Sequence, residues 1–408
     1  MRDPLAVDTK IEPRRAVVTV VAAALVVFAL ITLNPSVLGT IAVILAFFVM
    51  IMLHEFGHFV TAKRTGMKVT EFFVGFGPRI WSFTKGETEY GIKALPLGGY
   101  CKIVGMTNLE DVAPEDEPRT YRSKSYGARV LVASAGSLTH FAIALVLMFI
   151  VLTFGSLIQP TTTLAEVVKG QPAAIAGLEK GDRIQSIDGH RVRSWTDVRN
   201  VIAPKGGQTV SFVVERHGLF RTIKVKLASQ TDLGAHRGYA GFLPTTHHVH
   251  YSPIAAAGKA PVEVWNIGRE SIGALGKIFS LHGITSYVHT VSGSSTSPSD
   301  SSNRFISPVG LGTIAHDAVV AGWISVFGLL ISINVFIGIF NLMPLLPFDG
   351  GHIAIATYEQ LASLVKGKRV QVDVAKLLPL TVAVIGVLGF IFLSSLFLDI
   401  SHPIQNPF

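Results

Sequence analysis

Charged residues and cysteine are scarce in this chain of 408 residues. Asp, Glu, Lys and Arg make up 15% of it, against 49% hydrophobic residues, and its mean hydropathy is +0.48. This balance excludes an ordinary soluble enzyme and indicates a protein with several membrane-spanning helices. The single cysteine, Cys101, excludes an intrachain disulfide and a cysteine-based zinc site.

The net charge of +8 does not indicate a nucleic-acid partner. The basic residues gather beside apolar runs, which is the pattern of the positive-inside rule, and no basic patch carries interleaved aromatic residues. Their positions predict a multi-pass membrane protein with a cytoplasmic N-terminus. The C-terminus and the strand-rich segment at 161–230 would then lie outside the cytoplasm.

Apolar runs divide the chain into predicted spans and connecting segments. The predicted spans are 16–33, 37–62, 128–158, 316–366 and 374–398. The predicted connecting segments are a cytoplasmic N-terminus at 1–15, a β region at 63–127, a strand-rich domain at 161–230, and an amphipathic helix with a Ser-rich linker at 231–305. The predicted fold class is a polytopic α-helical membrane protein with a membrane-associated β-sheet and an inserted α+β domain. Two alternatives stay open: an ordinary cytoplasmic hairpin at 63–127, and packing of the amphipathic helix on the inserted domain.

A His-Glu-x-x-His motif, His54 to His58, lies near the end of the apolar run 37–62. On a helix the two histidines lie on one face, where both imidazoles can bind one Zn²⁺, and Glu55 is placed to act as general base. Ionisable groups at membrane depth are costly and by default mark function. The alternative, two structural histidines in a chance match, is disfavoured because that cost needs a reason.

Asp349 is the candidate for the third protein ligand that a catalytic zinc requires. Pro344, Pro347 and two glycines interrupt the apolar stretch around it, so the helix should unwind there. An Asp at such a break can turn inward to a cation, or it can cap the following helix. Asn341, with the two prolines, is a candidate contact for the substrate and its oxyanion, although an Asn also commonly ends a helix.

The segment 161–230 resembles a PDZ domain of the bacterial protease type. It carries Ala-Gly-Leu-x-x-Gly-Asp at 176–182, followed by Ile-x-x-Ile-Asp-Gly at 184–189. Such a domain offers a sheet edge and backbone N–H groups to an extended peptide, or it serves as a rigid plug or filter. The candidate groove residues are Gly177, Leu178, Gly181 and Asp182.

The order of these motifs resembles the intramembrane site-2 proteases. Within them it resembles the bacterial regulator-of-sigma proteases with a PDZ insert, and among those the actinobacterial Rip-type members. The resemblance runs from about residue 37 to residue 400, so the span 16–33 is extra to the family's four-helix core. Three further short segments, 74–78, 96–99 and 307–310, also match motifs of this family and support the resemblance.

The resemblance implies a zinc metalloendopeptidase of the bacterial plasma membrane that cuts transmembrane segments. His54, His58 and Asp349 would hold Zn²⁺, and Glu55 would be the base. Its substrates would be membrane-anchored regulators such as anti-sigma factors already trimmed by a first protease, with the PDZ domain excluding larger proteins. The strand residues that would pair with an unwound substrate are Pro96, Leu97, Gly98 and Gly99.

Two other functions compete with this one. The first is an inactive membrane receptor or chaperone that binds peptides through its PDZ domain, and the intact Glu55 disfavours it. The second is a zinc or cation transporter, which would need polar residues spread over several spans and no PDZ module.

Overall fold

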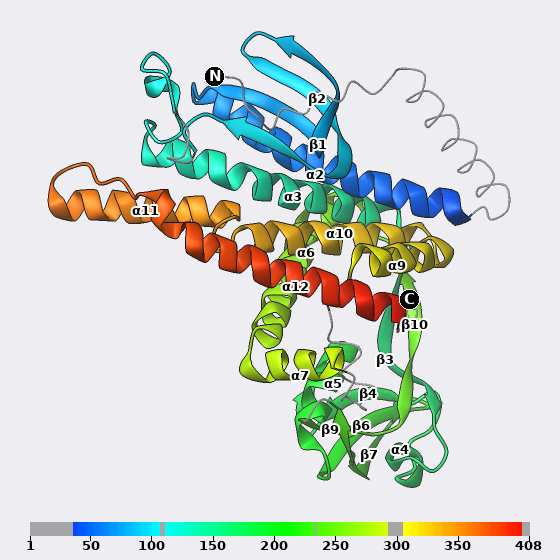
Figure 1. Cartoon of the computed structure of the whole chain (residues 1–408). Helices are drawn as coiled ribbons and strands as arrows, with labels where there is room; N and C mark the ends of the chain where they lie inside the picture. Colours follow the sequence, from blue (N-terminus) through cyan, green and yellow to red (C-terminus); the bar gives the residue numbers. More distant parts are fainter. Residues whose placement is uncertain (1–35, 107–110, 233–234, 293–304, 402–408) are drawn as a thin grey trace. The chain divides into compact units, whose positions relative to one another are not determined.

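The computed structural model describes residues 36–106, 111–232, 235–292 and 305–401 (Figure 1). The chain forms two compact units: the first runs to Val151 and resumes at Ala257, and the second holds Leu152–Ala256. The predicted segments 1–15 and 16–33, and most of the Ser-rich linker, lie outside the described residues.

The first unit is built on long apolar helices. Four of the described helical stretches are long and apolar enough to cross a membrane. The helices concerned are α2 (Ser36–Arg64), α3 (Tyr126–Phe154), α10 (Trp323–Asn341) and α12 (Leu378–Ser401), the last preceded by the turn η3 (Val374–Leu377). Large apolar side chains such as Leu45, Phe390 and Leu393 are exposed, as expected for surfaces that face lipid.

Two predicted spans differ from the structure in their bounds. The helix predicted to run to residue 158 ends at Phe154, because Gly155 interrupts it and a strand begins at Leu157. The stretch predicted as one broken span at 316–366 is three helices: α9 (Pro308–Ala321), α10 and α11 (Asp349–Lys366). Gly322 separates the first two with a φ of 111°, which no α-helix contains.

The predicted β region contains one long hairpin of β1 (Val69–Lys85) and β2 (Thr88–Ile103). Val74 lies opposite Gly99, but the segment 71–74 also pairs with 89–92, so the hairpin folds back on itself. It packs on α2 and α3 through a buried apolar cluster. The cluster consists of Ala62, Met67, Val69, Ile103, Tyr121 and Val132.

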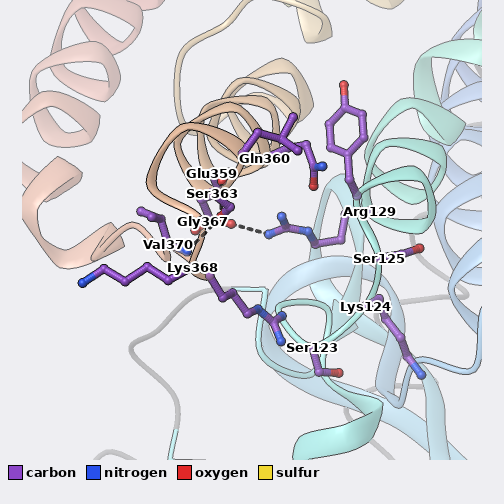
Figure 2. A pocket seen from close by; sticks show the side chains of 13 residues that line it. Ser123, Lys124, Ser125, Arg129, Glu359, Gln360, Ser363, Gly367, Lys368 and Val370 are labelled. Atoms are coloured by element: carbon purple, nitrogen blue, oxygen red, sulfur yellow. Dashed lines mark hydrogen bonds and ion pairs between the residues drawn. The ribbon is translucent and has the colours of Figure 1, made fainter.

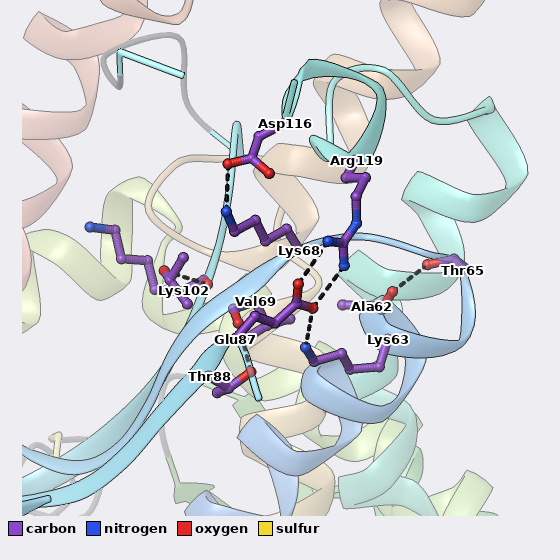
Figure 3. A network of polar contacts seen from close by, with 11 residues as sticks. Ala62, Lys63, Thr65, Lys68, Val69, Glu87, Thr88, Lys102, Asp116 and Arg119 are labelled. Atoms are coloured by element: carbon purple, nitrogen blue, oxygen red, sulfur yellow. Dashed lines mark hydrogen bonds and ion pairs between the residues drawn. The ribbon is translucent and has the colours of Figure 1, made fainter. Parts of the chain in front are cut away.

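A polar network joins the turn of this hairpin to the end of α2 (Figure 3). Glu87 accepts hydrogen bonds from Lys63 at 2.5 Å and from Arg119, the last residue of the short helix η1 (Glu117–Arg119), at 2.7 Å. Lys68 pairs with Asp116 at 2.5 Å. Apolar packing and ion pairs together fix the sheet on the helix that carries the His-Glu-x-x-His motif.

The amphipathic segment is α6 (Pro253–Ile278), followed by α7 (Leu281–Val291). From Ala257 onward these helices belong to the unit of the membrane spans, not to the inserted domain. The hydroxyl of Tyr287 on α7 lies 2.7 Å from that of Ser394 on α12.

The second unit is a six-stranded sheet with the order β10-β3-β4-β6-β7, and β5 pairs with β4. A buried apolar core that includes Leu164, Ile184, Phe212 and Val225 supports it. The elements are β3 (Leu157–Val167), α4 (Pro172–Ile175), β4 (Arg183–Ile187), β5 (His190–Arg191), α5 (Trp195–Ile202), η2 (Ala203–Lys205), β6 (Thr209–Arg216), β7 (Leu219–Lys226) and β10 (Phe242–Val249), with a separate ribbon of β8 (Ala228–Asp232) and β9 (Ala235–Tyr239).

The inserted domain therefore extends beyond the predicted range 161–230 at both ends. Strand β10 pairs antiparallel with β3, and it lies in the range predicted as helix and linker. Its second half, Thr245–Val249, is mostly polar because it lies at the edge of the sheet, so it lacks the apolar alternation by which a strand is recognised.

Candidate metal centre

The helix α2 brings the two motif histidines together one turn apart. His54 and His58 are both buried, and their Nε2 atoms lie 3.2 Å apart. Asp349, the first residue of α11, places its Oδ2 atom 3.4 Å from Nε2 of His54 and 3.3 Å from Nε2 of His58. Two neighbouring histidines and an aspartate almost three hundred residues later thus direct one ligand atom each at a common point.

The spacing of these atoms fits a zinc ion. Zn²⁺ binds imidazole nitrogen and carboxylate oxygen at about 2.0–2.2 Å, so two ligands of a tetrahedral site lie about 3.3 Å apart. The three observed separations are 3.2, 3.3 and 3.4 Å. Within the described part of the chain, the buried Oδ2 of Asp349 has no hydrogen-bond donor. Such a buried carboxylate oxygen requires a cationic partner.

The structure distinguishes the two roles considered for Asp349. The chain leaves the helical conformation between Asn341 and Asp349, as the prolines and glycines predicted. The N-cap of α11 is Phe348, and it makes no side-chain cap hydrogen bond. Since Asp349 lies inside the helix and its Oδ2 faces two imidazoles, the geometry favours a ligand over a cap.

Neighbouring groups on α3 orient the histidines. Nδ1–H of His58 donates to the carbonyl of Val132 at 2.7 Å, which leaves Nε2 as the basic nitrogen of that ring. Gly136 lies directly against both imidazoles: a Cβ atom there would lie 2.5 Å from each Nε2. No side chain larger than hydrogen fits between α3 and the histidines.

The sequence analysis missed a polar pair beside the triad. His140 and Asn334 are fully buried, and Nδ1–H of His140 donates to Oδ1 of Asn334 at 2.8 Å. The His140 ring lies 5.0 Å from that of His54. Burying a histidine or an asparagine inside an apolar span costs free energy, so the positions of both residues within such spans could have marked them in the sequence.

Glu55 lies between the triad and the sheet. Its carboxyl contacts the backbone of Cys101 in β2, and a Cβ atom on Gly99 would lie 3.5 Å from its Cγ. The predicted substrate-pairing residues Gly98 and Gly99 are therefore part of β2 beside Glu55, whereas the side chains of Pro96 and Leu97 lie outside the described part.

The predicted substrate contacts near Asp349 lie on and after the end of α10. Asn341 is the last residue of that helix, and Pro344 and Pro347 are exposed in the segment before α11. Pro344 lines an apolar hollow of about 310 Å³ between α11 and α12, together with Ile355 and Leu380.

The four predicted groove residues of the inserted domain have different environments. A hollow of about 490 Å³ lies beside β3, and among the four only Leu178 lines it. Asp182 is fully buried: Arg216 donates to it at 2.6 and 2.8 Å, and the same guanidinium binds the carbonyl of Gly177. These hydrogen bonds give Asp182 a structural role in the inserted domain.

Known proteins resemble this chain over most of its length. Residues 42–385 match Peptidase family M50. The chain is 33% identical to the zinc metalloprotease Rip1 of Mycolicibacterium smegmatis and 34% identical to that of Mycobacterium tuberculosis, each over 90% of this chain and 98% of the relative. It is 28% identical to the metalloprotease MmpA of Caulobacter vibrioides, over 77% of this chain and 84% of that protein.

Among solved structures, the PDZ domain of an SdrC-like protein from Listeria innocua is 28% identical. It covers 22% of this chain and 99% of that domain, with a TM-score of 0.19.

The family match covers both halves of the candidate metal centre, since it includes the part of α2 that carries His54 and His58, and all of α10 and α11. It also covers the inserted domain, two candidate spans completely and parts of the other two. Together with the named relatives, it favours an enzyme over a peptide receptor or a transporter. The chain belongs to peptidase family M50, the site-2 proteases, and is a membrane zinc metalloprotease with an inserted domain of mixed strands and helices.

Proposed function

We propose that the protein cuts the transmembrane segment of single-span regulators, such as anti-sigma factors that another protease has already trimmed. His54, His58 and Asp349 hold the zinc ion, and Glu55 is the general base. The observation that carries this proposal is the convergence of three ligand atoms at 3.2–3.4 Å, two of them on the apolar, membrane-length helix α2.

Each residue of the site has a separate task in peptide hydrolysis. Zinc, when bound, supplies a Lewis acid that polarises the peptide carbonyl and makes water more acidic. Glu55 takes the proton from the attacking water and transfers it to the leaving amine. Asn341 donates to the developing oxyanion from the end of α10.

The substrate must be unwound before it is cut, because the hydrogen bonds of a helix shield its peptide groups. The segment Pro96–Gly99 of β2 supplies main-chain groups with which an extended substrate can pair. Gly99 lies against Glu55, so a strand added at this position would bring its peptide bond close to the base. Pro344 and Pro347, exposed before α11, would contact the substrate near Asp349.

The distribution of basic residues supports an orientation for the chain. Lys63 and Arg64 end α2, Lys124 and Arg129 flank the start of α3, and Lys376 precedes α12. By the positive-inside rule these ends are cytoplasmic, which places the N-terminus in the cytoplasm and the PDZ domain and C-terminus outside. The PDZ domain then meets the outer part of a substrate and excludes one that has not been trimmed.

A cleavage assay with the purified full-length protein tests the proposal. A single-span substrate without its outer domain is incubated with wild type and with Glu55→Gln, and mass spectrometry locates the cut. We expect a cut within the apolar span from wild type alone, while the variant retains zinc. Cleavage by Glu55→Gln would refute the role of the base, and a cut outside the span would refute intramembrane action.

A further inference from the structure

A third hollow, whose lining includes none of the metal-centre residues, lies between the start of α3 and the end of α11 (Figure 2). Its volume is about 460 Å³. Residues 123–126 and Arg129 form one wall, and residues from Glu359 to Val370 form the other. Both walls adjoin candidate membrane spans, because α3 begins at Tyr126 and the last span begins at Val374.

The lining of this hollow is strongly cationic. Lys124, Arg129, Lys368 and Arg369 contribute positive charge, against the single carboxylate of Glu359. That carboxylate already accepts hydrogen bonds from Arg129 at 2.5 Å and from the backbone N–H of Val372 at 2.6 Å. It has little capacity left to neutralise the other cations.

Arg129 is the deepest of these cations. It is 8% exposed, and its Nε atom has no acceptor within the described residues. A buried guanidinium with a spare donor is costly unless an acceptor completes its hydrogen bonds. Figure 2 shows Arg129 pointing at Glu359, with Lys124 and Lys368 extending on opposite sides. Their flexible side chains can close on an anion placed between them.

The apolar surroundings indicate where such an anion comes from. On α11, beside the cationic wall, Leu361, Leu364 and Val365 are 58%, 70% and 87% exposed. Tyr126 is exposed on the opposite wall. Apolar side chains exposed to this degree suit acyl chains, and tyrosine is typical of the membrane–water interface. A charged head bound in the hollow could therefore continue into chains that lie along α11.

We propose that this hollow binds the phosphate group of an anionic phospholipid. The shared chemistry is that of a phosphate, whose oxygens accept from the guanidinium and ammonium groups, and the exposed face of α11 selects the lipid over free phosphate. The site does not depend on the proteolytic chemistry, so it can be tested in a protein that does not cleave.

The test is native mass spectrometry of the full-length protein in detergent, titrated separately with phosphatidylglycerol, phosphatidylcholine and inorganic phosphate. The test variant is Lys124→Ala/Lys368→Ala, whose side chains line the hollow without an ion pair in the described structure. The matched control is Lys366→Ala/Lys376→Ala, which removes the same charge from exposed residues outside the lining. Thermal unfolding and zinc content establish that both variants are folded.

We expect wild type to retain phosphatidylglycerol in preference to phosphatidylcholine. The test variant should bind phosphatidylglycerol about tenfold more weakly, since each basic residue near the site adds attraction for an anionic lipid, and the control should stay close to wild type. Equal retention of the two lipids, or equal losses in the two variants, would overturn the proposal. Binding of inorganic phosphate without any preference for phosphatidylglycerol would also overturn it.

Discussion

At the scale of single residues, Gly136 decides whether the metal centre can form. A methyl group added at this residue would lie only 2.5 Å from the Nε2 atoms of both His54 and His58. We predict that Gly136→Ala lowers zinc occupancy and cleavage at least about tenfold, because the imidazoles must turn away from their ligand positions. Metal analysis of the purified protein measures the effect.

Gly127→Ala is the control for this substitution, since a methyl group at Gly127, on the same helix, meets nothing within 4 Å. It should keep wild-type zinc content. A Gly136→Ala protein with full zinc content and full activity would show that the histidines can move without loss, against the packing described above.

The buried pair of His140 and Asn334 gives a second prediction at this scale. Asn334→Leu leaves Nδ1–H of His140 without its acceptor in an apolar environment. We expect the free energy of unfolding to fall by about 1 kcal/mol, the cost of one unsatisfied buried group in a helix bundle. Adding His140→Phe should recover part of this loss in a double-mutant cycle, and an additive result would mean that the two residues are not coupled.

The metal-centre residues could be predicted from the sequence because each belongs to a recognisable pattern. His54 and His58 share a helical spacing, and Asp349 lies among helix-breaking residues. His140 and Asn334 belong to no spacing pattern, and only the fold pairs them across 194 positions. The contact of Gly136 with both imidazoles is likewise a property of how α3 packs, which a single sequence does not determine.

At the scale of elements, the hairpin β1–β2 is held on α2 partly by Glu87. Hydrogen bonds from Arg119 and Lys63 lower the pKa of Glu87 from 4.5 to about 2. A carboxyl whose pKa is lower in the folded state stabilises the fold above its unfolded pKa. That contribution is lost as the pH falls from about 4.5 toward 2.

We therefore predict that Glu87→Gln lowers the melting temperature at neutral pH, and that the difference from wild type shrinks below about pH 4.5 and disappears near pH 2. The effect should stay within about 1 kcal/mol, because the pair is partly exposed to solvent. Glu115→Gln is the control, because it changes an exposed glutamate in the loop between β2 and η1. A difference between Glu87→Gln and wild type that does not vary with pH would contradict the assignment.

Element boundaries followed from the sequence where Pro and Gly mark them. The break before Asp349 was predicted, and the structure confirms it between Asn341 and Asp349. The division at Gly322 was missed, because one glycine within an apolar run is common in membrane helices. Strand β10 was missed for a different reason: its pairing with β3 joins segments about 80 residues apart, and its own residues are mostly polar.

At the scale of the whole molecule, zinc ties α2 to α11, since its proposed ligands come from both. Removing it with a chelator should abolish cleavage and lower the melting temperature, because the binding energy of the ion favours the folded state. Zn²⁺ should restore both properties and Mg²⁺ neither, since imidazole ligands suit zinc. Full activity after the zinc content has fallen to background would refute a catalytic role for the ion.

The inserted domain leaves and rejoins the rest of the chain at neighbouring points. Leu157 at the start of β3 pairs with Val249 at the end of β10, so the two ends of the insertion are cross-strand neighbours. Such neighbours have α-carbons about 5 Å apart, a distance that a short Gly/Ser linker can bridge. Replacement of residues 158–248 by that linker should therefore leave the membrane unit able to fold.

This deletion separates the two roles considered for the domain. If the domain excludes large substrates, the shortened protein should cut a trimmed substrate within a few-fold of the wild-type rate and should also cut the untrimmed form, which wild type leaves intact. We predict this outcome, because three of the four candidate groove residues do not line the hollow beside β3. Loss of cleavage of the trimmed substrate, in a shortened protein that still holds zinc, would instead show that the domain must bind the substrate.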